Sequence, residues 1–261
     1  MTGDVLTGGL PHLSLGAGPP LVVLVFTPEA AIPTGLARWS LTRMVRPFAQ
    51  DFTVHVVNRP PGLPPTTTMA ELAAVYAAAI EATFEGPVRM LAISTGGSIA
   101  LQLAADHPGL VDRLALAGTA CTLGPVGRWA QRAFIDRARQ GKRPNPALAE
   151  VVTESALGRR LLSGLLWLSD SGRKDHTDAV TVLNAEDGFD LRARLHDITA
   201  ATLLIHGAKD LVYPLELARQ TAEGIPGARL IVYRGRGHSR TFTDRRFAAD
   251  ALAFLDASVP R

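Results

Sequence analysis

Short apolar segments that alternate with amphipathic helical stretches constrain the fold of this chain more than any other feature of its sequence. The apolar segments, each bounded by glycine, proline or polar residues, are residues 21–26, 53–58, 88–93, 114–117, 202–206 and 229–233. The helical stretches are residues 34–50, 69–84, 96–107, 215–223 and 243–257. Continuous apolar strands separated by helices are typical of a parallel sheet covered on both faces. We therefore predict an α/β fold with a doubly wound, mainly parallel sheet.

This alternation is interrupted over residues 127–199, where only helical patterns appear. An insertion of this length that carries its own helices is more than a loop. We predict that residues 123–197 form a helical cap and that residues 1–122 and 198–261 form one α/β core. The cap would lie outside the carboxyl ends of the strands, where ligands bind in open α/β sheets. Two separate domains are disfavoured, because the strand and helix pattern resumes after the insertion.

Composition and charge exclude several classes of protein. A chain of 261 residues that is 47% apolar and 20% charged can bury a large core, which excludes a disordered chain. The 27 lysines and arginines against 24 acidic residues leave a net charge of only +3, so we expect no nucleic-acid partner. The single cysteine, Cys121, has no partner for an intramolecular disulfide and cannot build a cysteine-based zinc site.

The location of the protein is predicted from its apolar runs. The longest runs, residues 21–26 and 161–168, are far shorter than the ~20 residues that a membrane-spanning helix needs. Residues 1–15 lack the basic and apolar regions of a secretory signal. We therefore expect a soluble, cytoplasmic protein with no membrane span. Neither His55 nor His107 has metal-ligand spacing with a partner, so we expect no metal site. We also expect no cofactor.

The most informative motif is Ala92-Ile93-Ser94-Thr95-Gly96, where a predicted strand runs directly into a helix. A serine at such a turn projects from the sheet, and small residues two positions before and after it let the strand and helix approach closely. Ser94 is therefore a candidate nucleophile. The backbone N–H of Thr95 would lie at a helix N-terminus, where developing negative charge is favoured.

Two later loops supply the groups that a serine nucleophile needs. A base must take the serine proton, and a carboxylate must orient that base. Asp210 follows the predicted strand 202–206, and His238 follows the predicted strand 229–233. The order Ser94, Asp210, His238 is that of hydrolases whose serine lies on a strand-to-helix turn. Glu216 is an alternative acid, although a favourable charge in the first turn of its helix explains it better.

With these motifs, the chain resembles the α/β-hydrolase fold superfamily, in its capped serine esterase and lipase-like branch. The resemblance covers residues 21–255 and is carried by Ala92 to Gly97, the run from Leu204 to Asp210, and Gly237-His238-Ser239. It implies that Ser94 is the nucleophile, Asp210 the acid and His238 the base.

The chain departs from the pattern of the family it resembles at the loop after the first long strand. Many relatives carry His-Gly there and use the loop to donate a second N–H to the oxyanion, whereas this chain reads Val25-Phe26-Thr27-Pro28. Proline has no N–H, so Pro28 cannot be the donor. We predict that Thr95 and Thr27 form the oxyanion hole, with Phe26 as the alternative to Thr27. Ala92 stands where relatives usually have glycine, a change that packing tolerates.

The substrate is predicted more coarsely. Apolar side chains of the insertion, including Trp129 and Trp167, either pack the cap onto the core or line an acyl pocket together with Phe26. Arginines around His238 either form an exposed basic loop or steer an anionic substrate. We expect a carboxylesterase that cleaves small to medium apolar esters, as a monomer or homodimer. The same three residues also serve carbon–carbon bond hydrolases, lactonases and perhydrolases, and a non-catalytic ligand-binding member of the fold is a further alternative.

Overall fold

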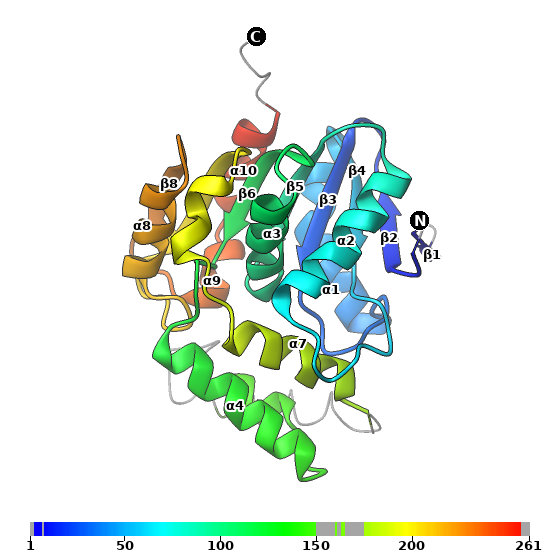
Figure 1. Cartoon of the computed structure of the whole chain (residues 1–261), viewed down its shortest axis with the longest axis vertical. Coiled ribbons are helices and arrows are strands. Elements are labelled where there is room, and N and C mark those ends of the chain that lie inside the picture. Colours follow the sequence, from blue (N-terminus) through cyan, green and yellow to red (C-terminus); the bar gives the residue numbers. More distant parts are fainter. Residues whose placement is uncertain (1–2, 7, 150–159, 161–162, 165–174, 257–261) are drawn as a thin grey trace.

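The computed structural model describes residues 3–6, 8–149, 160, 163–164 and 175–256. Within these residues, eight strands form one sheet in the order β1-β2-β4-β3-β5-β6-β7-β8. The β1–β2 and β2–β4 pairs are antiparallel, and every other pair in the sheet is parallel. The prediction of a doubly wound, mainly parallel α/β sheet is confirmed (Figure 1).

The six strands predicted from the sequence are all present, and two further strands lie at one edge of the sheet. The strands are β1 (Gly3–Val5), β2 (Pro11–Leu15), β3 (Pro20–Val25), β4 (Thr53–Val57), β5 (Val88–Ile93), β6 (Val111–Ala117), β7 (Ala201–Gly207) and β8 (Arg229–Tyr233). The sequence reading missed β1 and β2, because β1 has three residues and β2 lacks a continuous apolar run.

Most predicted helices agree with the structure to within a residue. The helices of the core are α1 (Gly35–Val45), α2 (Met69–Thr83), α3 (Thr95–Asp106), α8 (Leu215–Gly224), α9 (His238–Phe242) and α10 (Phe247–Leu255). The single helix predicted over residues 34–50 is wrong, because α1 gives way to a 3₁₀ helix at Arg46–Gln50. Pro47 lies in that segment and has no N–H to continue an α-helix. The helix predicted over residues 243–257 begins later, at Phe247.

Two apolar layers sandwich the sheet, as alternation along the strands requires. On β3, Val22 and Leu24 pack into the cluster that contains residues of α2 and α3. Leu21 and Val23 point to the opposite face and pack against α1 and α10. All four side chains are at most 1% exposed. Because both faces are covered, the site must lie at an edge or an end of the sheet.

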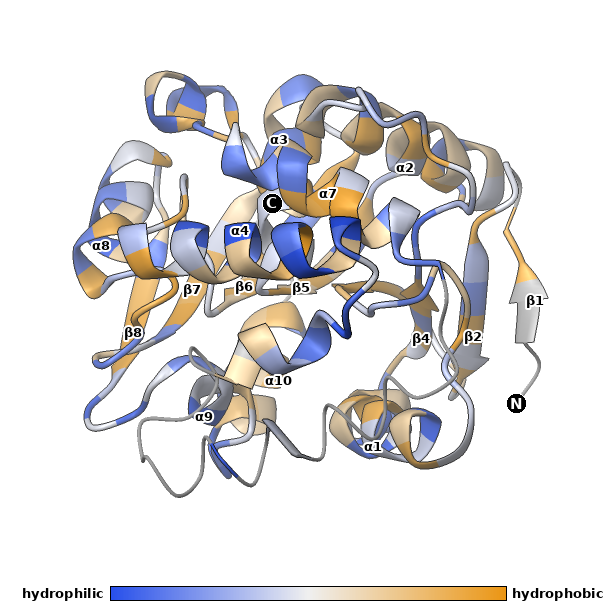
Figure 2. Ribbon diagram, turned by 90° about the horizontal axis from the view of Figure 1, so that it is seen from below, coloured by the Kyte–Doolittle hydropathy of each residue, from blue (hydrophilic) through white to orange (hydrophobic). Residues whose placement is uncertain are grey.

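Two helices of the predicted cap are described, α4 (Pro125–Arg139) and α7 (Thr177–Asp187), together with 3₁₀ turns at Asn145–Leu148 and Arg192–Asp197. The two helices lie at one end of the sheet (Figure 1), and Figure 2 views the molecule from that end. They pack together through Phe134, Ile135, Ala179 and Leu183, and Phe26 of the core contacts this cluster. The division at residues 123 and 197 remains a prediction.

A short bridge joins the two ends of this excursion. Thr122 and Asp190 form an isolated antiparallel pair, and the Leu191 N–H donates to the Cys121 carbonyl over 2.8 Å. The Thr122 hydroxyl donates to the Phe189 carbonyl over the same distance. The chain therefore leaves the core and returns to it at almost the same point.

Candidate active site

The turn between β5 and α3 holds Ser94 in a strained conformation. Ser94 has φ +56° and ψ −129°, and among the described residues it is the one non-glycine with positive φ. Such a conformation costs energy and persists only where the surrounding structure enforces it. Here the Ser94 N–H donates to the Ala117 carbonyl over 3.0 Å, and its carbonyl accepts from the Gly97 N–H over 2.7 Å. The turn therefore presents the serine at the carboxyl end of β5.

Gly96 allows α3 to approach β3 closely. A Cβ at residue 96 would lie 2.4 Å from the Leu24 carbonyl oxygen, which is backbone and cannot rotate away. We therefore expect Gly96→Ala to lower the free energy of unfolding by about 1–3 kcal/mol and to lower catalytic activity by displacing the turn. Urea denaturation and the initial rate of ester hydrolysis measure the two effects.

Gly188→Ala is the matched control for this substitution. Gly188 has φ −86°, and the nearest atom to an added Cβ lies 3.7 Å away. Its free energy of unfolding should stay within about 0.5 kcal/mol of wild type. Equal losses in the two variants would mean that the close approach at Gly96 has no particular importance.

The three residues singled out by their order in the chain lie together in space. The Ser94 Oγ is 2.9 Å from Nε2 of His238, and His238 Nδ1 is 2.8 Å from Oδ2 of Asp210. Ser94 comes from the β5–α3 turn, Asp210 follows β7, and His238 is the first residue of α9 after β8. Asp210 is 4% exposed and His238 is 8% exposed. The three side chains form one continuous chain of hydrogen bonds, which ends at the Ser94 hydroxyl.

Asp210 is bound on both of its oxygens. Oδ1 accepts the backbone N–H groups of Val212 and Tyr213 over 2.9 and 3.0 Å, which leaves Oδ2 to face His238. Burial raises the pKa of this carboxyl group, but the charge and hydrogen bond of His238, together with His206, bring it below its ordinary value. An ionised Asp210 accepts a hydrogen bond from the Nδ1–H group of His238, so the unprotonated Nε2 is the nitrogen that can take a proton from Ser94.

A second histidine, His206 at the end of β7, supports the loop that carries Asp210. It is fully buried, its Nε2–H donates to the Tyr213 carbonyl over 2.7 Å, and the same nitrogen lies 3.8 Å from Oδ2 of Asp210. These contacts give His206 a structural role in holding the loop that carries Asp210.

Burial of His206 predicts a pH dependence of stability. Burial lowers its pKa below the ordinary 6.5, and although Asp210 and the Tyr213 carbonyl act in the opposite direction, burial dominates. The unfolded chain therefore binds this proton more readily than the folded protein does. The resulting stabilisation is complete above pH 6.5 and is lost as the pH falls below that value. Urea denaturation at pH 8, 6 and 5 measures the loss.

Two variants separate this effect from other titrations. In His206→Gln the fall in stability between pH 8 and 5 should be smaller than in wild type. His196→Gln is the control, because the His196 side chain is 73% exposed and stays in water in both states. An unchanged pH dependence in His206→Gln would contradict the assignment.

A buried carboxylate next to these residues was not predicted. Glu186 of α7 is fully buried, and its Oε1 accepts from the Ser98 hydroxyl over 2.7 Å and from the Tyr213 hydroxyl over 2.5 Å. Its Oε2 accepts from the Gln131 amide of α4 over 2.5 Å. The Tyr213 ring stacks on His238 with centroids 5.9 Å apart. Glu186 thus connects the helices of the insertion to the surroundings of His238, and no motif in the sequence marks it.

The two predicted oxyanion donors come from the start of α3 and from the loop after β3. Thr95 is the first residue of α3, so its backbone N–H is among those that a helix leaves without an internal partner. Thr27 lies two residues beyond Val25, which pairs with Ile93 just before Ser94. The Thr27 carbonyl and hydroxyl are bound to Arg59 and Asn58, and its remaining backbone polar group is the N–H.

The predicted pocket residues have different surroundings. Phe26 is half-buried and borders a cavity of about 10 Å³, too small for a substrate, beside Gly96 and Ile99. Trp129 does not pack inward as expected, since it is 55% exposed and α4 buries Ala130 and Phe134 instead. Trp167 lies outside the described residues.

The structure also places the alternative acid and the arginines near His238. The side chain of Glu216 is 83% exposed and lies 3.7 Å from Arg219, so Glu216 is not the acid that faces His238. Among the arginines near His238, Arg236 is bound to Asp244 over 2.7 Å. Arg234 and Arg240 are exposed, as the basic-loop alternative requires.

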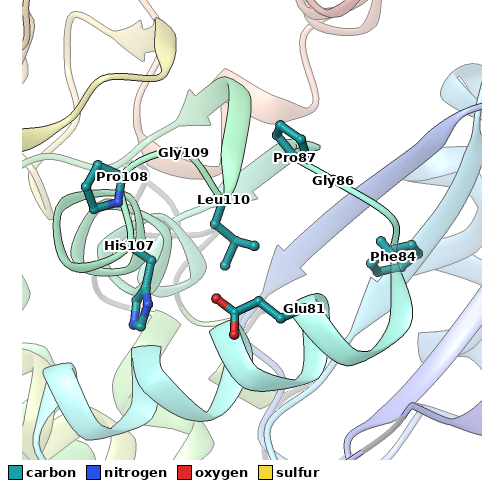
Figure 3. A pocket seen from close by; sticks show the side chains of 8 residues that line it. All are labelled: Glu81, Phe84, Gly86, Pro87, His107, Pro108, Gly109 and Leu110. Atoms are coloured by element: carbon teal, nitrogen blue, oxygen red, sulfur yellow. The ribbon is translucent and has the colours of Figure 1, made fainter.

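A surface cleft of about 510 Å³ lies at the opposite end of the molecule from Ser94. Figure 3 shows the side chains of Glu81 and His107 facing it from α2 and from the residue after α3. The twelve residues of α3 separate His107 from Ser94 by roughly 18 Å, at a rise of about 1.5 Å per residue. This cleft therefore cannot deliver a substrate to Ser94.

The described residues carry neither a metal-binding cluster nor a membrane-spanning helix. Within them, no three His, Cys, Asp or Glu side chains come together as a metal site would require. None of the described helices is long and apolar enough to cross a membrane.

Comparison with known proteins identifies the family. The sequence profile of the serine aminopeptidase S33 hydrolases matches residues 65–245. The pimeloyl-(acyl-carrier protein) methyl ester esterase of Chromobacterium violaceum is 28% identical over 92% of this chain and 95% of its own. The Aromatoleum aromaticum enzyme of the same name is 34% identical in an alignment that covers 56% of this chain and 64% of that relative.

A solved structure gives the same answer for the fold. The enol-lactonase of Burkholderia xenovorans LB400 superimposes with a TM-score of 0.76 at 21% identity, over 98% of this chain and 100% of that one. The strand order, the sharp turn at Ser94 and these similarities agree. The chain is therefore a hydrolase with the α/β-hydrolase fold and belongs to the serine aminopeptidase S33 family.

Proposed function

We propose that this protein is a serine carboxylesterase that cleaves small to medium apolar esters through an acyl-enzyme on Ser94. The observation that carries the proposal is the unbroken hydrogen-bond chain from Ser94 through His238 to Asp210. A serine hydroxyl is a weak nucleophile unless a base takes its proton, and here the base is in contact with it and oriented by a carboxylate.

The reaction proceeds in two halves. Ser94 Oγ attacks the ester carbonyl while His238 Nε2 takes its proton, and the tetrahedral intermediate expels the alcohol, which receives that proton from His238. Water then attacks the acyl-enzyme, with His238 again taking and returning a proton, and the carboxylic acid leaves. Asp210 holds the imidazole in the required tautomer and stabilises its charged form. The chain's own residues complete the cycle without a cofactor.

Two backbone N–H groups stabilise the negative charge on the former carbonyl oxygen. Thr95 supplies one from the N-terminus of α3, and Thr27 supplies the other from the loop after β3. Donors fixed in advance favour the transition state because they need no reorganisation when the charge develops. We propose that the insertion of residues 123–197, of which α4 and α7 are described, caps this site.

The substrate class is inferred from apolar surroundings and from relatives. Phe26 contacts the apolar cluster of α4 and α7, so the approach to Ser94 from that side is apolar. The relatives named above are methyl ester esterases, which favours an ester with a small alcohol. The partner is a small-molecule ester rather than a nucleic acid, and we propose a cytoplasmic monomer or homodimer.

A series of p-nitrophenyl esters from acetyl to decanoyl tests the proposal. We expect saturable hydrolysis with an optimum at short to medium chains, and covalent labelling of Ser94 by a fluorophosphonate. L-alanine p-nitroanilide and an aliphatic lactone are assayed in parallel, because the family name denotes an aminopeptidase and other members of the fold open lactones. Faster turnover of the anilide or the lactone would replace the ester assignment.

A further inference from the structure

The loop that follows β3 is bound by two adjacent residues that follow β4. The side-chain amide of Asn58 donates to the Thr27 hydroxyl over 2.8 Å. The same nitrogen lies 2.7 and 2.8 Å from the carbonyl oxygens of Glu29 and Ala31. Asn58 is 5% exposed, so these contacts are largely shielded from water.

Arg59 binds the part of the loop closest to the turn. Its Nη1 donates to the Thr27 carbonyl over 2.6 Å, and its Nη2 donates to the Pro28 carbonyl over 2.8 Å. The guanidinium carbon lies 5.3 Å from the centroid of the Phe26 ring. One planar group therefore contacts three consecutive residues of the loop.

The charge of Arg59 is buried without an ion pair in the part of the chain that the structure describes. Arg59 is 2% exposed, and its Nε has no hydrogen-bond partner there. Burial lowers its pKa, yet an arginine remains protonated at neutral pH. The carboxylates of Asp178 and Glu29 oppose the effect of burial on its pKa from beyond ion-pair distance, and a buried charge that is not directly paired is costly.

The position of the loop connects this charge to Ser94. Val25 pairs with Ile93 across the β3–β5 ladder, so Phe26 and Thr27 emerge beside the turn. Arg59 and Gly96 border the same small cavity, and Gly96 lies two residues after Ser94. The guanidinium is thus packed between the loop and the start of α3.

We propose that Arg59, together with Asn58, is a positioning residue that holds the Phe26–Pro28 loop so that the Thr27 N–H faces the oxyanion. The inference rests on the proposed ester hydrolysis at Ser94. Because Pro28 has no N–H, the loop offers few donors, and a rotation at Thr27 would misdirect the one that matters. The buried positive charge also favours a negative charge forming nearby, and that charge appears only as the reaction proceeds.

The test compares Arg59→Met with Arg113→Met. Arg113 is a matched control, since it is 6% exposed, donates to the Phe254 carbonyl, lies over the Phe254 ring at 5.4 Å and has an unpartnered Nε. It lies near the amino end of β6, away from Ser94. We expect Arg59→Met to lower kcat about 100-fold with KM within threefold, and Arg113→Met to change kcat less than threefold.

A second readout does not depend on the ester chosen. A phenylboronic acid forms a tetrahedral anion on the nucleophilic serine, so its affinity for Arg59→Met should fall in parallel with kcat. Fluorophosphonate labelling of Ser94 should slow to a similar degree. Equal losses in both arginine variants, or a raised KM with unchanged kcat in Arg59→Met, would overturn the inference.

Two further variants apply if Arg59→Met folds poorly. Asn58→Ala loosens the same loop without removing a charge and should lower kcat by a smaller factor. Arg59→Lys keeps the charge but cannot span both carbonyl groups, so it should restore part of the activity. If wild type reacts with the fluorophosphonate and these variants react equally fast, only the inference fails. If wild-type Ser94 does not react at all, the proposed function fails with it.

Discussion

Replacing Ser94 with alanine is expected to lower kcat for a p-nitrophenyl ester by at least about 10⁴-fold. The hydroxyl is the group in contact with His238, and its loss leaves the base with nothing to activate. Substrate binding should change little, because Ala fills nearly the same space. Single-turnover hydrolysis and mass spectrometry of the fluorophosphonate-treated protein measure the loss of the acyl-enzyme and of the label.

Ser98→Ala is the control for this result. Ser98 is a buried serine one turn further along α3, but its hydroxyl donates to Glu186 rather than to a histidine. We expect it to retain activity to within about tenfold and to lower the free energy of unfolding by about 1–3 kcal/mol, because Glu186 loses a donor. Persistent hydrolysis and labelling in Ser94→Ala would refute the assignment of the nucleophile.

Asp210→Asn is expected to lower kcat about 10³- to 10⁴-fold while preserving the fold. The backbone N–H groups of Val212 and Tyr213 both donate to Oδ1, so an amide at this position must place its oxygen there. Its NH₂ group then faces Nδ1 of His238. That contact selects the tautomer with the proton on Nε2, which cannot accept a proton from Ser94.

The tautomer can be observed directly. Nitrogen NMR of labelled histidine should show the His238 proton moving from Nδ1 in wild type to Nε2 in Asp210→Asn. Asp244→Asn is the matched control, since Asp244 is a buried carboxylate bound to Arg236 and Arg246. It should keep activity to within a few-fold. An Asp210→Asn enzyme with more than a tenth of wild-type activity would mean that another group orients His238.

The core of this fold could be predicted because its signals are local. Each central strand is buried on both faces and therefore reads as a continuous apolar run, as Leu21–Leu24 does. The edge strands β1 and β2 were not predicted, because a strand of three residues, or one that is partly polar, has no continuous apolar run. The pairing of β2 depends on β4, which is far away in the sequence, and β1 pairs only with β2.

The candidate site likewise contains residues that the sequence predicts and residues that it does not. Ser94, Asp210 and His238 each follow a predicted strand, and the carboxyl ends of parallel strands meet at one end of a sheet, so their proximity could be expected. Glu186 and Arg59 carried no signal. Their roles follow from their surroundings in the fold. Three side chains donate to the Glu186 carboxylate, and the Arg59 guanidinium donates to two backbone carbonyl groups.

The sequence alone determined the fold class and the three residues that meet at the carboxyl ends of the parallel strands. Strand periodicity and the sharp turn at Ser94 are properties of neighbouring residues, so the sequence could reveal them. Only the tertiary structure decided how Asp210 is oriented, which residues hold the Thr27 loop, and that Trp129 faces solvent. These outcomes depend on contacts between segments such as Thr27 and Arg59, which lie 32 residues apart and are brought together by the β3–β4 pairing. Such contacts arise from packing in three dimensions, which no local pattern of residues encodes.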